Sequence, residues 1–308
     1  MSKIHVATII TPDHLDKAYT MLESMRQFQD CHLHILLVAG LTVGAKVNLP
    51  ANKNVTFYYP NDLFEGQSGR LNRLIFSKYS VIEETRPSNI APLDYLRWAL
   101  KPGFTHFLLK KFDKIIHCDC DLHFYNDFEE IIDYASDKSL VISPHWRTIH
   151  SMSSDELRYN FIHGLYNAGF FIATQKAGEI LEWWSERCCV ECSATSGTTY
   201  VDQKYLDLVP LYFENVGIIR HKGYNVAAWN ANYLKRTIEN GIVLVEGQPI
   251  IFIHYSPITI IWIENKTDPY LIKHLAEYKQ ALLKQQTSFY RESKQQFTTI
   301  DTTQINII

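Results

Sequence analysis

The sequence has little excess charge of either sign. Its 308 residues carry a formal net charge of −3, and charged residues make up 20% of the chain. Nucleic-acid-binding proteins usually show a strongly basic face, so this balance predicts no nucleic-acid partner. With 46% hydrophobic residues, the chain is long enough to bury the core of one large α/β domain or of two small ones.

Long apolar segments are also lacking. The N-terminal run MSKIHVATIITPDHL has one Lys and is broken by Thr and Pro, without the apolar region and cleavage site of a secretory signal. The longest apolar stretch, residues 249–263, is interrupted by His254 and Pro257 and is shorter than the about 20 residues needed to span a bilayer. We expect a cytoplasmic protein, which leaves open a peripheral contact with the inner face of a membrane.

The cysteines do not indicate a disulfide framework. Six of them stand at positions 31, 118, 120, 188, 189 and 192. Without a signal sequence, such cysteines are typical of reduced thiols. The pairs Cys118-x-Cys120 and Cys189-x-x-Cys192 lack the joint spacing and the His partners of a zinc finger, so we favour thiols over a zinc site.

Strand and helix patterns alternate from the first residues, which predicts a mostly parallel sheet with crossover helices. The predicted strands are residues 4–10, 33–39, 55–59, 114–118, 141–142, 168–173 and 250–253, the last of which we expect to close the sheet. The predicted helices are 13–28, 177–188 and 94–109, the last interrupted at Lys101-Pro102-Gly103 because Pro breaks a helix interior.

The C-terminal segment has a different pattern. Residues 268–289 place apolar side chains near one helical face, with lysines elsewhere. We expect this helix to pack against the preceding domain rather than to lie on a membrane, and the residues after Thr298 to be frayed. The predicted organisation is therefore one domain over 1–265 and a C-terminal amphipathic helix and tail over 266–308.

The most informative segment is Asp119-Cys120-Asp121, which directly follows the apolar strand 114–118. In an extended chain the two Asp side chains point the same way and Cys120 points the opposite way. Two like charges about 4 Å apart cost roughly 1 kcal/mol in water and about 4 kcal/mol near a protein surface, and a divalent cation removes that cost. Carboxylates suit Mg²⁺ or Mn²⁺, and open α/β sheets bind ligands at the carboxyl ends of their strands. The alternative is that one Asp caps the following helix and the other is solvated.

Several motifs follow in order between Leu96 and Ser256. They are ALKP (99–102), HCDCD (117–121), YNAGFF (166–171), YVDQKYLDLVP (200–210), GYNVAAWN (223–230) and FIHYS (252–256). With this set the chain resembles the GT-A class of nucleotide-sugar glycosyltransferases, in the branch of glycogenin and the bacterial lipopolysaccharide galactosyltransferases. The resemblance implies a GT-A (Rossmann-like), mostly parallel sheet flanked by helices. It also implies a hexosyltransferase that moves a sugar, with retention, from a nucleotide diphosphate-sugar (UDP-sugar favoured) to a glycan, lipid-linked or protein acceptor.

Two positions depart from the pattern of the group. Cys120 stands where the group usually has Pro, and Pro257 stands where it commonly has Gly after His-Phe-Ser. The first side chain faces away from the expected metal, whereas the second replaces a flexible residue by a rigid one. These departures motivate an alternative, a catalytically inactive nucleotide-sugar-binding or scaffold protein on the same fold. A phosphotransferase or nucleotidyltransferase is disfavoured because the motif GxxxxGK[ST] is absent from the sequence.

The resemblance implies that Asp119, Asp121 and His254 together hold one divalent ion, Mn²⁺ or Mg²⁺. A neutral imidazole can complete a carboxylate site and favours Mn²⁺ slightly. The ion would stabilise the diphosphate as it leaves. For His254 the alternative is a hydrogen-bonded core histidine.

Other residues receive donor-binding roles from the resemblance. Lys101 is expected to provide a cation for the diphosphate, with Arg97 one turn earlier as a substitute; the alternative for Lys101 is a surface lysine at a helix start. Asn167 and Gly169 match an Asn-x-Gly that lines the transferred sugar. Thr8, at the end of the first strand, is assigned to the nucleotide by fold analogy alone.

The remaining assignments concern the reacting centre and the acceptor side. Asp202 and Gln203 match an Asp-Gln pair near the reacting carbon, and with Asn167 they form the expected catalytic set. Asp202 is a candidate for binding a sugar hydroxyl, for stabilising an oxocarbenium-like centre or for acting as a base; its alternative is a helix N-cap. Asn225 and Trp229 are expected to contact the substrates from the acceptor side, and the alternative for Trp229 is a core position.

Overall fold

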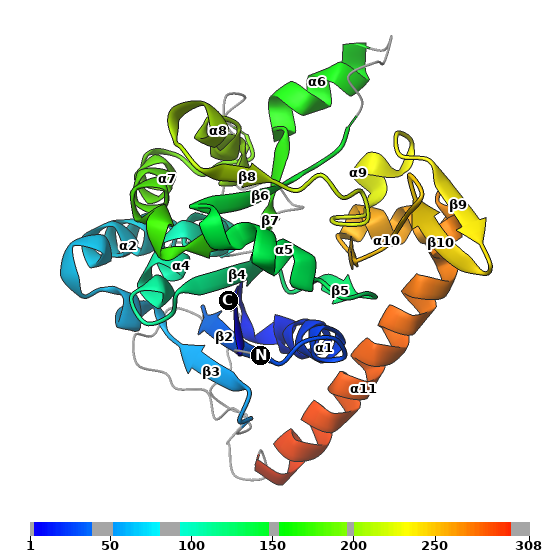
Figure 1. The fold of residues 1–308 in the computed structure, drawn as a ribbon. Coiled ribbons are helices and arrows are strands. Elements are labelled where there is room, and N and C mark those ends of the chain that lie inside the picture. The colour runs from blue at the N-terminus through cyan, green and yellow to red at the C-terminus, as the bar shows by residue number, and fades with distance from the viewer. Residues whose placement is uncertain (1–2, 39–51, 81–92, 148–153, 196–199, 297–308) are drawn as a thin grey trace.

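A seven-stranded sheet forms the centre of the computed structural model, which describes residues 3–38, 52–80, 93–147, 154–195 and 200–296 (Figure 1). Its strands are β1 (Ile4–Ile10), β2 (Cys31–Leu37), β3 (Val55–Tyr58), β4 (Lys114–Cys118), β6 (Leu140–Pro144), β7 (Tyr166–Thr174) and β8 (Val216–Ile218). They lie in the order β3-β2-β1-β4-β7-β6-β8. All neighbours are parallel except β7, which runs antiparallel to both β4 and β6. The predicted mostly parallel sheet is confirmed.

Helices cover both faces of this sheet. On one face lie α2 (Gly66–Tyr79), α3 (Asp94–Ala99), α4 (Lys101–Leu109) and α7 (Gly178–Val190), and on the other lie α1 (Leu15–Arg26) and α5 (Glu129–Tyr134). Because side chains alternate along β1, Ala7 and Ile9 belong to the first core, whereas Val6 and Ile10 belong to the second. The predicted interruption near Pro102 is also confirmed, since α4 begins at Lys101 with Pro102 in its first turn.

Two small sheets lie outside the central one. One consists of β9 (Arg236–Glu239), β10 (Ile242–Val245) and β11 (Gln248–Pro249), and the other pairs β5 (Leu122–Phe124) with β12 (Phe252–His254). The expectation that residues 250–253 close the central sheet is therefore wrong. An apolar run indicates a buried strand but not its partner, and here β12 pairs antiparallel with β5, the short strand that follows the acidic turn.

Short helices connect these parts of the fold. They are α6 (Ser154–His163), α8 (Val209–Tyr212), α9 (Ala228–Ala231), α10 (Pro257–Glu264) and the 3-10 segments η1 (Pro12–His14), η2 (Pro60–Leu63), η3 (Ala135–Asp137), η4 (Gln175–Ala177), η5 (Gln203–Asp207) and η6 (Pro269–Leu271).

The C-terminal helix α11 (Ile272–Gln296) crosses the outside of the domain and packs against α1 (Figure 1). Tyr278 stacks on Tyr255 with ring centroids 4.1 Å apart, and Gln286 donates a hydrogen bond to Asp16 in α1. Within the described residues, the predicted packing of this helix on the preceding domain is confirmed. The expected frayed tail after Thr298 lies outside the described residues, and the boundary at residue 265 stays a prediction.

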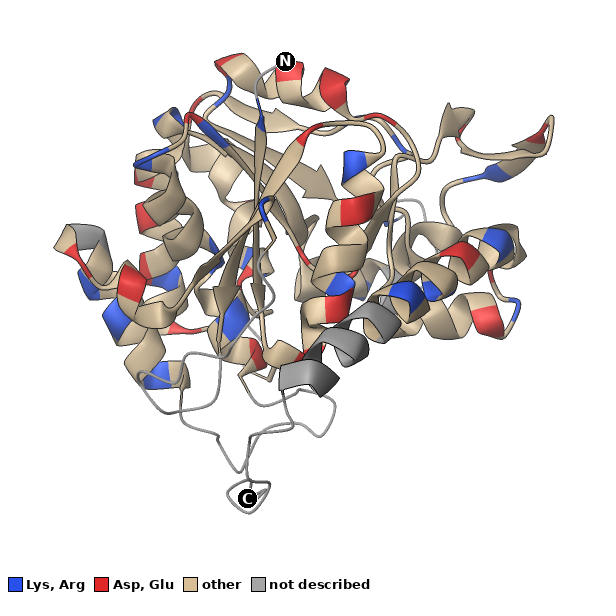
Figure 2. Cartoon of the chain, turned by 90° about the horizontal axis from the view of Figure 1, so that it is seen from below, with Lys and Arg blue, Asp and Glu red and all other residues tan. Residues whose placement is uncertain are grey.

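Charged residues of both signs are distributed over the described helices. Figure 2 shows Lys and Arg interspersed with Asp and Glu over the elements seen from below. None of the described helices combines the length and the apolar character that crossing a bilayer requires.

Candidate metal centre

The acidic segment forms a turn at the carboxyl end of β4. The strand ends at Cys118, and the backbone N–H of Leu122, the first residue of β5, donates to the carbonyl oxygen of Asp119 (3.3 Å). The two carboxylates therefore converge because the chain turns. From the sequence we had predicted their convergence from the alternation of side chains along a strand, and that reason is wrong. Cys120 is buried in the apolar core beside α1 and faces away from the carboxylates as expected.

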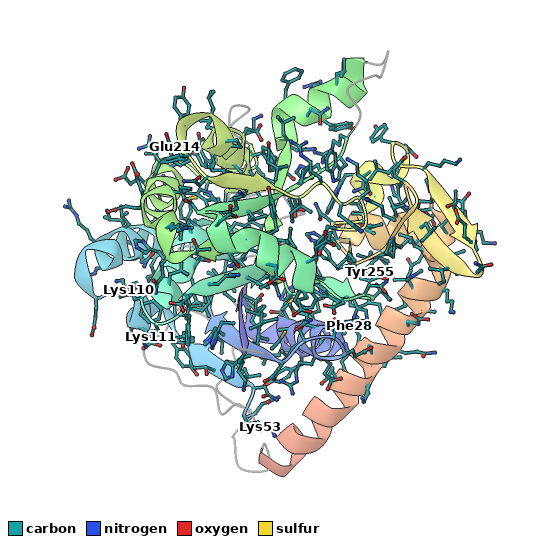
Figure 3. All side chains as sticks on the ribbon, viewed as in Figure 1. Phe28, Lys53, Lys110, Lys111, Glu214 and Tyr255 are labelled. Carbon is teal, nitrogen blue, oxygen red and sulfur yellow. The ribbon has the colours of Figure 1, made fainter. Side chains whose placement is uncertain are left out.

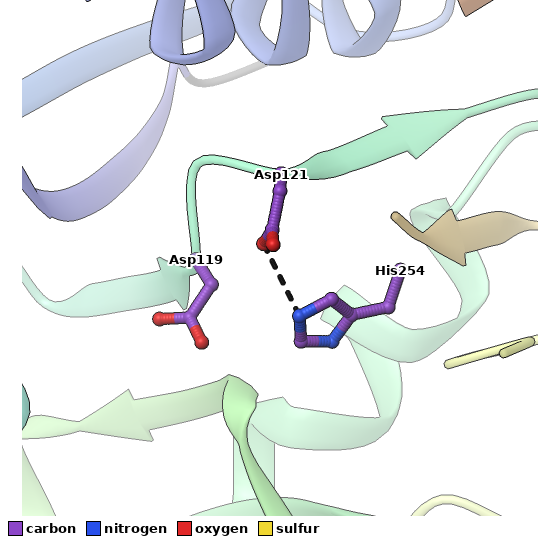
Figure 4. A group of neighbouring side chains, drawn as sticks. All are labelled: Asp119, Asp121 and His254. Carbon is purple, nitrogen blue, oxygen red and sulfur yellow. Dashed lines mark ion pairs between the residues drawn. The ribbon is translucent and has the colours of Figure 1, made fainter. Parts of the chain in front are cut away.

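Three side chains meet beside this turn (Figure 4). Asp119, Asp121 and His254 each offer one ligand atom, and these atoms all lie within 4.8 Å of one another. The shortest contact joins Nε2 of His254 to a carboxylate oxygen of Asp121 (3.1 Å). Solvent reaches 29% of the Asp119 side chain and 19% of Asp121, so an ion has access to the carboxylates. This group is called the triad below.

The pairing of β5 with β12 brings His254 to the turn. His254 lies opposite Leu122 in the antiparallel register, and the N–H of Tyr255 donates to the carbonyl oxygen of Asp121 (2.9 Å). On the other side of β12, the N–H of His254 donates to Val226 (2.9 Å). Backbone hydrogen bonds on both sides thus fix the third ligand against the first two.

The carboxylates and the imidazole of the triad shift one another's pKa values. Burial alone would raise the pKa of Asp121, but the adjacent His254 ring outweighs it and holds that pKa below its ordinary value. Burial alone would likewise lower the pKa of His254, and the carboxylates of Asp121 and Asp119 raise it. Two hard carboxylate donors with one imidazole suit Mn²⁺ or Mg²⁺, so the residues present fit the implied ion.

Lys101 lies behind the triad, inside the protein. Its ammonium nitrogen is 2.9 Å from a carboxylate oxygen of Asp119 and 3.6 Å from one of Asp202, and it donates to the carbonyl oxygen of Ala168 (3.3 Å). Burial would lower the pKa of Lys101, but the two carboxylates raise it, so the side chain is charged. At 4% exposure it is not the surface lysine of the alternative interpretation, and its role toward a diphosphate stays a prediction.

Asp202 is the most deeply buried carboxylate of this group, at 1% exposure. Burial raises its pKa to about 6, although the charge of Lys101 opposes the shift. Asp202 stands at the N-cap position of η5, but its side chain makes no capping hydrogen bond there. The N-cap alternative therefore does not account for this residue, whose side chain is aimed at Lys101 instead.

Comparison with known proteins places this geometry in a known fold. No protein-family model matches the chain. It is 28% identical over 272 residues to the uncharacterized protein YfnD of Bacillus subtilis, covering 85% of this chain and 80% of YfnD. It is 33% identical over 176 residues to the uncharacterized protein YfnF of the same organism, covering 54% of this chain and 58% of YfnF.

Among solved structures, that of the galactosyltransferase LgtC in complex with donor and acceptor sugar analogs superposes with a TM-score of 0.55 at 14% identity, over 91% of this chain and 95% of LgtC. The chain has the GT-A fold. The triad thus lies at the carboxyl end of a parallel strand of a GT-A sheet, the edge at which open α/β sheets bind their ligands.

The Asn-x-Gly segment of β7 lies against the triad in this GT-A fold. The amide oxygen of Asn167 accepts a hydrogen bond from the N–H of Gly169 (2.9 Å), and its amide nitrogen donates to Gln203 (3.4 Å). A Cβ atom added at Gly169 would lie 2.6 Å from the His254 ring and 2.9 Å from Asp119. Gly169 therefore keeps open the space between the ligands.

Replacing Gly169 with Ala should weaken Mn²⁺ binding at least tenfold, because the new methyl group displaces His254 or Asp119 by more than half an ångström. Overpacking typically costs about 1–3 kcal/mol, so the variant should still fold. Titration calorimetry with Mn²⁺ measures the change. The matched control is Gly178→Ala at the start of α7, where the nearest atom would be 3.8 Å away. Equal Mn²⁺ affinity in both variants would contradict this account of Gly169.

Trp229 lies in α9 beside the triad, and Asn225 lies in the segment before that helix. The indole of Trp229 packs edge-on against His254, with ring centroids 5.0 Å apart. Its Nε1 is buried and has no hydrogen-bond partner among the described residues, and the same holds for Oδ1 of Asn225. Asn225 is held by donating to the carbonyl oxygen of Pro144 (3.2 Å). Contact of Trp229 and Asn225 with a substrate stays a prediction.

The other predicted donor residues, Thr8 and Arg97, lie on β1 and α3. Thr8 is fully buried in β1, and its hydroxyl has no partner among the described residues. Arg97 forms an ion pair with Asp94 in α3. Their roles toward the donor stay predictions.

His145 is a site residue that the sequence interpretation missed. Its Nδ1 donates to the carbonyl oxygen of Gly164 (2.9 Å), which leaves Nε2 as the acceptor for the Asn167 amide (3.4 Å). The ring is 2% exposed and packs edge-on against Trp229. The signal was available, because His145 directly follows the buried strand β6 as Asp119 follows β4.

Proposed function

We propose that this protein transfers a glycosyl group from a nucleotide diphosphate-sugar to an acceptor in a reaction that depends on a divalent ion. The observation that carries the proposal is the meeting of Asp119, Asp121 and His254 within 4.8 Å at the carboxyl end of β4 in a GT-A fold. The likeness to LgtC, a galactosyltransferase whose structure holds donor and acceptor sugar analogs, supports it. A UDP-sugar is the favoured donor, by the resemblance of the motifs.

The triad residues bind and orient the donor. A divalent ion held there would stabilise the negative charge of the departing diphosphate as a Lewis acid. Asp119 and Asp121 supply its hard oxygen ligands, and the β5–β12 pairing fixes His254 as the third. Lys101, 2.9 Å from Asp119, keeps that carboxylate in place before an ion arrives.

Residues on β7 and η5 orient the sugar. The side chain of Asn167 is fixed between Gly169, His145 and Gln203, and Gln203 in turn donates to the carbonyl oxygen of His163 (2.9 Å). Such fixed amides hold sugar hydroxyls without a large loss of side-chain entropy on binding. For Asp202, which is buried next to Lys101, we propose the stabilisation of an oxocarbenium-like centre, in line with the retaining chemistry that the resemblance implies.

Neither departure from the family pattern obstructs this function. Cys120 points into the apolar core, away from the carboxylates. Pro257 is the first residue of α10, where Ser256 caps the helix by accepting a hydrogen bond from the N–H of Thr259 (3.4 Å). Pro is favoured at that position, so it starts a helix and leaves the His254 backbone extended. These observations favour an active enzyme over a scaffold protein.

A ligand-dependent melting experiment tests the proposal. UDP with Mn²⁺ should raise the melting temperature of the chain, because a ligand at 100 times its dissociation constant adds roughly 2.7 kcal/mol of stability. EDTA should abolish the shift. A panel of UDP- and GDP-sugars with Mn²⁺ should then include at least one donor that releases its sugar to water or to an added acceptor. Binding without any release over hours would support the scaffold alternative, and no shift with any nucleotide would refute the proposal.

A further inference from the structure

Three histidines lie together near the amino ends of β1 and β2, at the opposite end of these strands from the triad. His5 is near the start of β1, and His32 and His34 are on the neighbouring β2, where His5 lies opposite His32. Because side chains alternate along parallel strands in register, all three project from the face covered by α2 and α4. About four residues of strand, or roughly 13 Å, separate this histidine cluster from the level of Asp119.

Two of the rings already have the spacing of metal ligands. Nδ1 of His5 is 3.0 Å from Nε2 of His34. Two nitrogens bound at about 2.0–2.1 Å to a tetrahedral zinc ion lie about 3.3–3.4 Å apart, so a small widening admits the ion in place of the shared proton. The ring of His32 is next to them, with its centroid 4.9 Å from that of His34 and 6.1 Å from that of His5.

The outer contacts are compatible with the tautomer that metal binding requires. Nδ1 of His34 is 3.2 Å from the hydroxyl of Tyr58 on β3. Metal-binding histidines almost always donate their other ring N–H to an acceptor, and donation from Nδ1 of His34 to this hydroxyl would leave Nε2 without a proton on the side of His5. The His5 ring is held by stacking on Phe112 at a centroid distance of 3.8 Å.

The rings of the histidine cluster are neutral at physiological pH. Burial, together with the other two rings and Lys111, lowers the pKa of His34 to about 3. Burial also lowers the pKa values of His5 and His32, and Lys3 adds to both shifts. Lone pairs on nitrogen are therefore available to a metal without competition from protons.

The charged surroundings select the kind of ion. Lys3 and Lys111 are exposed side chains near the histidine cluster (Figure 3 labels Lys111). Asp30, near His32, is paired with Arg26. Hard cations such as Mg²⁺ bind through carboxylate charge, which the histidine cluster lacks. Imidazole nitrogen instead suits Zn²⁺, Ni²⁺ and Cu²⁺, which bind it tightly even near positive charge.

Solvent reaches the histidine cluster, because His5 and His32 are both partly exposed. A cavity of about 470 Å³ adjoins His5 and is also lined by Phe112, Lys3 and Lys111, whereas His32 and His34 are not part of its lining. A solvent molecule or small anion beside His5 can fill a fourth coordination position. The arrangement of three imidazoles with one open position is that of zinc sites with an exchangeable ligand.

We propose that His5, His32 and His34 form a second metal site, which binds Zn²⁺ or another late first-row divalent ion through three imidazole nitrogens. Among the described residues only the triad has its ligand atoms within 4.8 Å of one another, so His32 must turn toward the other two rings. It is partly exposed, and it exchanges its contact with the Thr56 hydroxyl (2.8 Å) for a bond to the ion. The site is separate from the triad and does not depend on the function proposed for it.

Titration of the chelator-stripped full chain with Zn²⁺ alone tests this proposal. The Asp121→Asn substitution weakens metal binding at the triad, and all other substitutions are made in this Asp121→Asn chain, called the background. One equivalent of Zn²⁺ should bind this background, and His5→Gln and His32→Gln should each lower the affinity at least tenfold. Tyr58→Phe removes the outer contact of His34 and should lower it by about tenfold. The matched control is His106→Gln, a half-buried histidine of α4 outside the cluster, and should change the affinity less than twofold.

A second measurement does not need the substituted background. Co²⁺ in a tetrahedral nitrogen site absorbs visible light much more strongly than Co²⁺ in an octahedral oxygen site. The wild-type chain should show the intense bands with the first equivalent of Co²⁺, and His5→Gln should lose them while its melting curve and its Mn²⁺ affinity stay unchanged. Affinity for Zn²⁺ that is unaffected by both His5→Gln and His32→Gln, or Co²⁺ bands that persist in His5→Gln, would overturn the proposal.

Discussion

The Asp121→Asn variant should lose at least about a thousandfold in turnover of a nucleotide-sugar while keeping its fold. Asp121 contributes one of the two carboxylates of the triad and contacts His254 at 3.1 Å. Lewis-acid stabilisation of a leaving diphosphate supplies several kcal/mol, and a loss of about 4 kcal/mol in the transition state corresponds to a factor of about a thousand. Steady-state release of the nucleoside diphosphate at saturating Mn²⁺ measures the effect.

The control for this prediction is Asp137→Asn, which changes the same net charge at a carboxylate of η3 that is 75% exposed. Its turnover should stay within twofold of wild type. Circular dichroism should superpose for all three proteins, because Asp→Asn conserves shape. Turnover of Asp121→Asn near the wild-type rate, or wild-type turnover that survives EDTA, would refute the metal-dependent mechanism.

Replacing Lys101 with Met should lower the free energy of unfolding by about 3–5 kcal/mol in the presence of EDTA. Lys101 is 5% exposed at its side chain and contacts carboxylates of Asp119 and Asp202, the second of which is only 2% exposed. Removing one partner of a buried charge group leaves the others uncompensated, which is the costly case for buried ion pairs. Urea unfolding of the metal-free chain measures the loss.

A specific signature separates this electrostatic effect from lost packing. Mn²⁺ should stabilise Lys101→Met by more than it stabilises wild type, because the ion replaces the missing positive charge next to Asp119. The control is Lys279→Met, whose ion pair with Glu264 is about half exposed and should contribute less than about 1 kcal/mol. An equal response of Lys101→Met and wild type to Mn²⁺ would contradict the account of Lys101 as a counter-charge.

Local sequence patterns were sufficient for the elements that position the carboxylates. The apolar run 4–10 and the run 114–118 are strands with the predicted bounds, and the acidic pair directly follows the second run. These predictions depend only on side-chain hydrophobicity over a few residues. The break at Pro102 belongs to the same class, because proline removes a backbone donor wherever it stands.

These local patterns could not predict which strands pair with one another. The run 250–253 is apolar in the same way as a central strand, yet it pairs with β5. Strand β7 enters the sheet antiparallel to both of its neighbours, although its apolar sequence is like that of the parallel strands. The interaction of Lys101 with Asp119 and Asp202 joins three distant segments, so composition and spacing do not reveal it. His254 was assigned to the metal only through the family resemblance.

The order of the triad along the chain has a consequence for protein synthesis. Asp119 and Asp121 leave the ribosome long before His254, whose strand β12 completes the group by pairing with β5. Until then, Lys101 and Asp119 are already present in the nascent chain and neutralise each other once α4 and β4 meet. A polypeptide arrested before β12 therefore lacks the imidazole ligand, and we expect it to bind Mn²⁺ more weakly than the full chain.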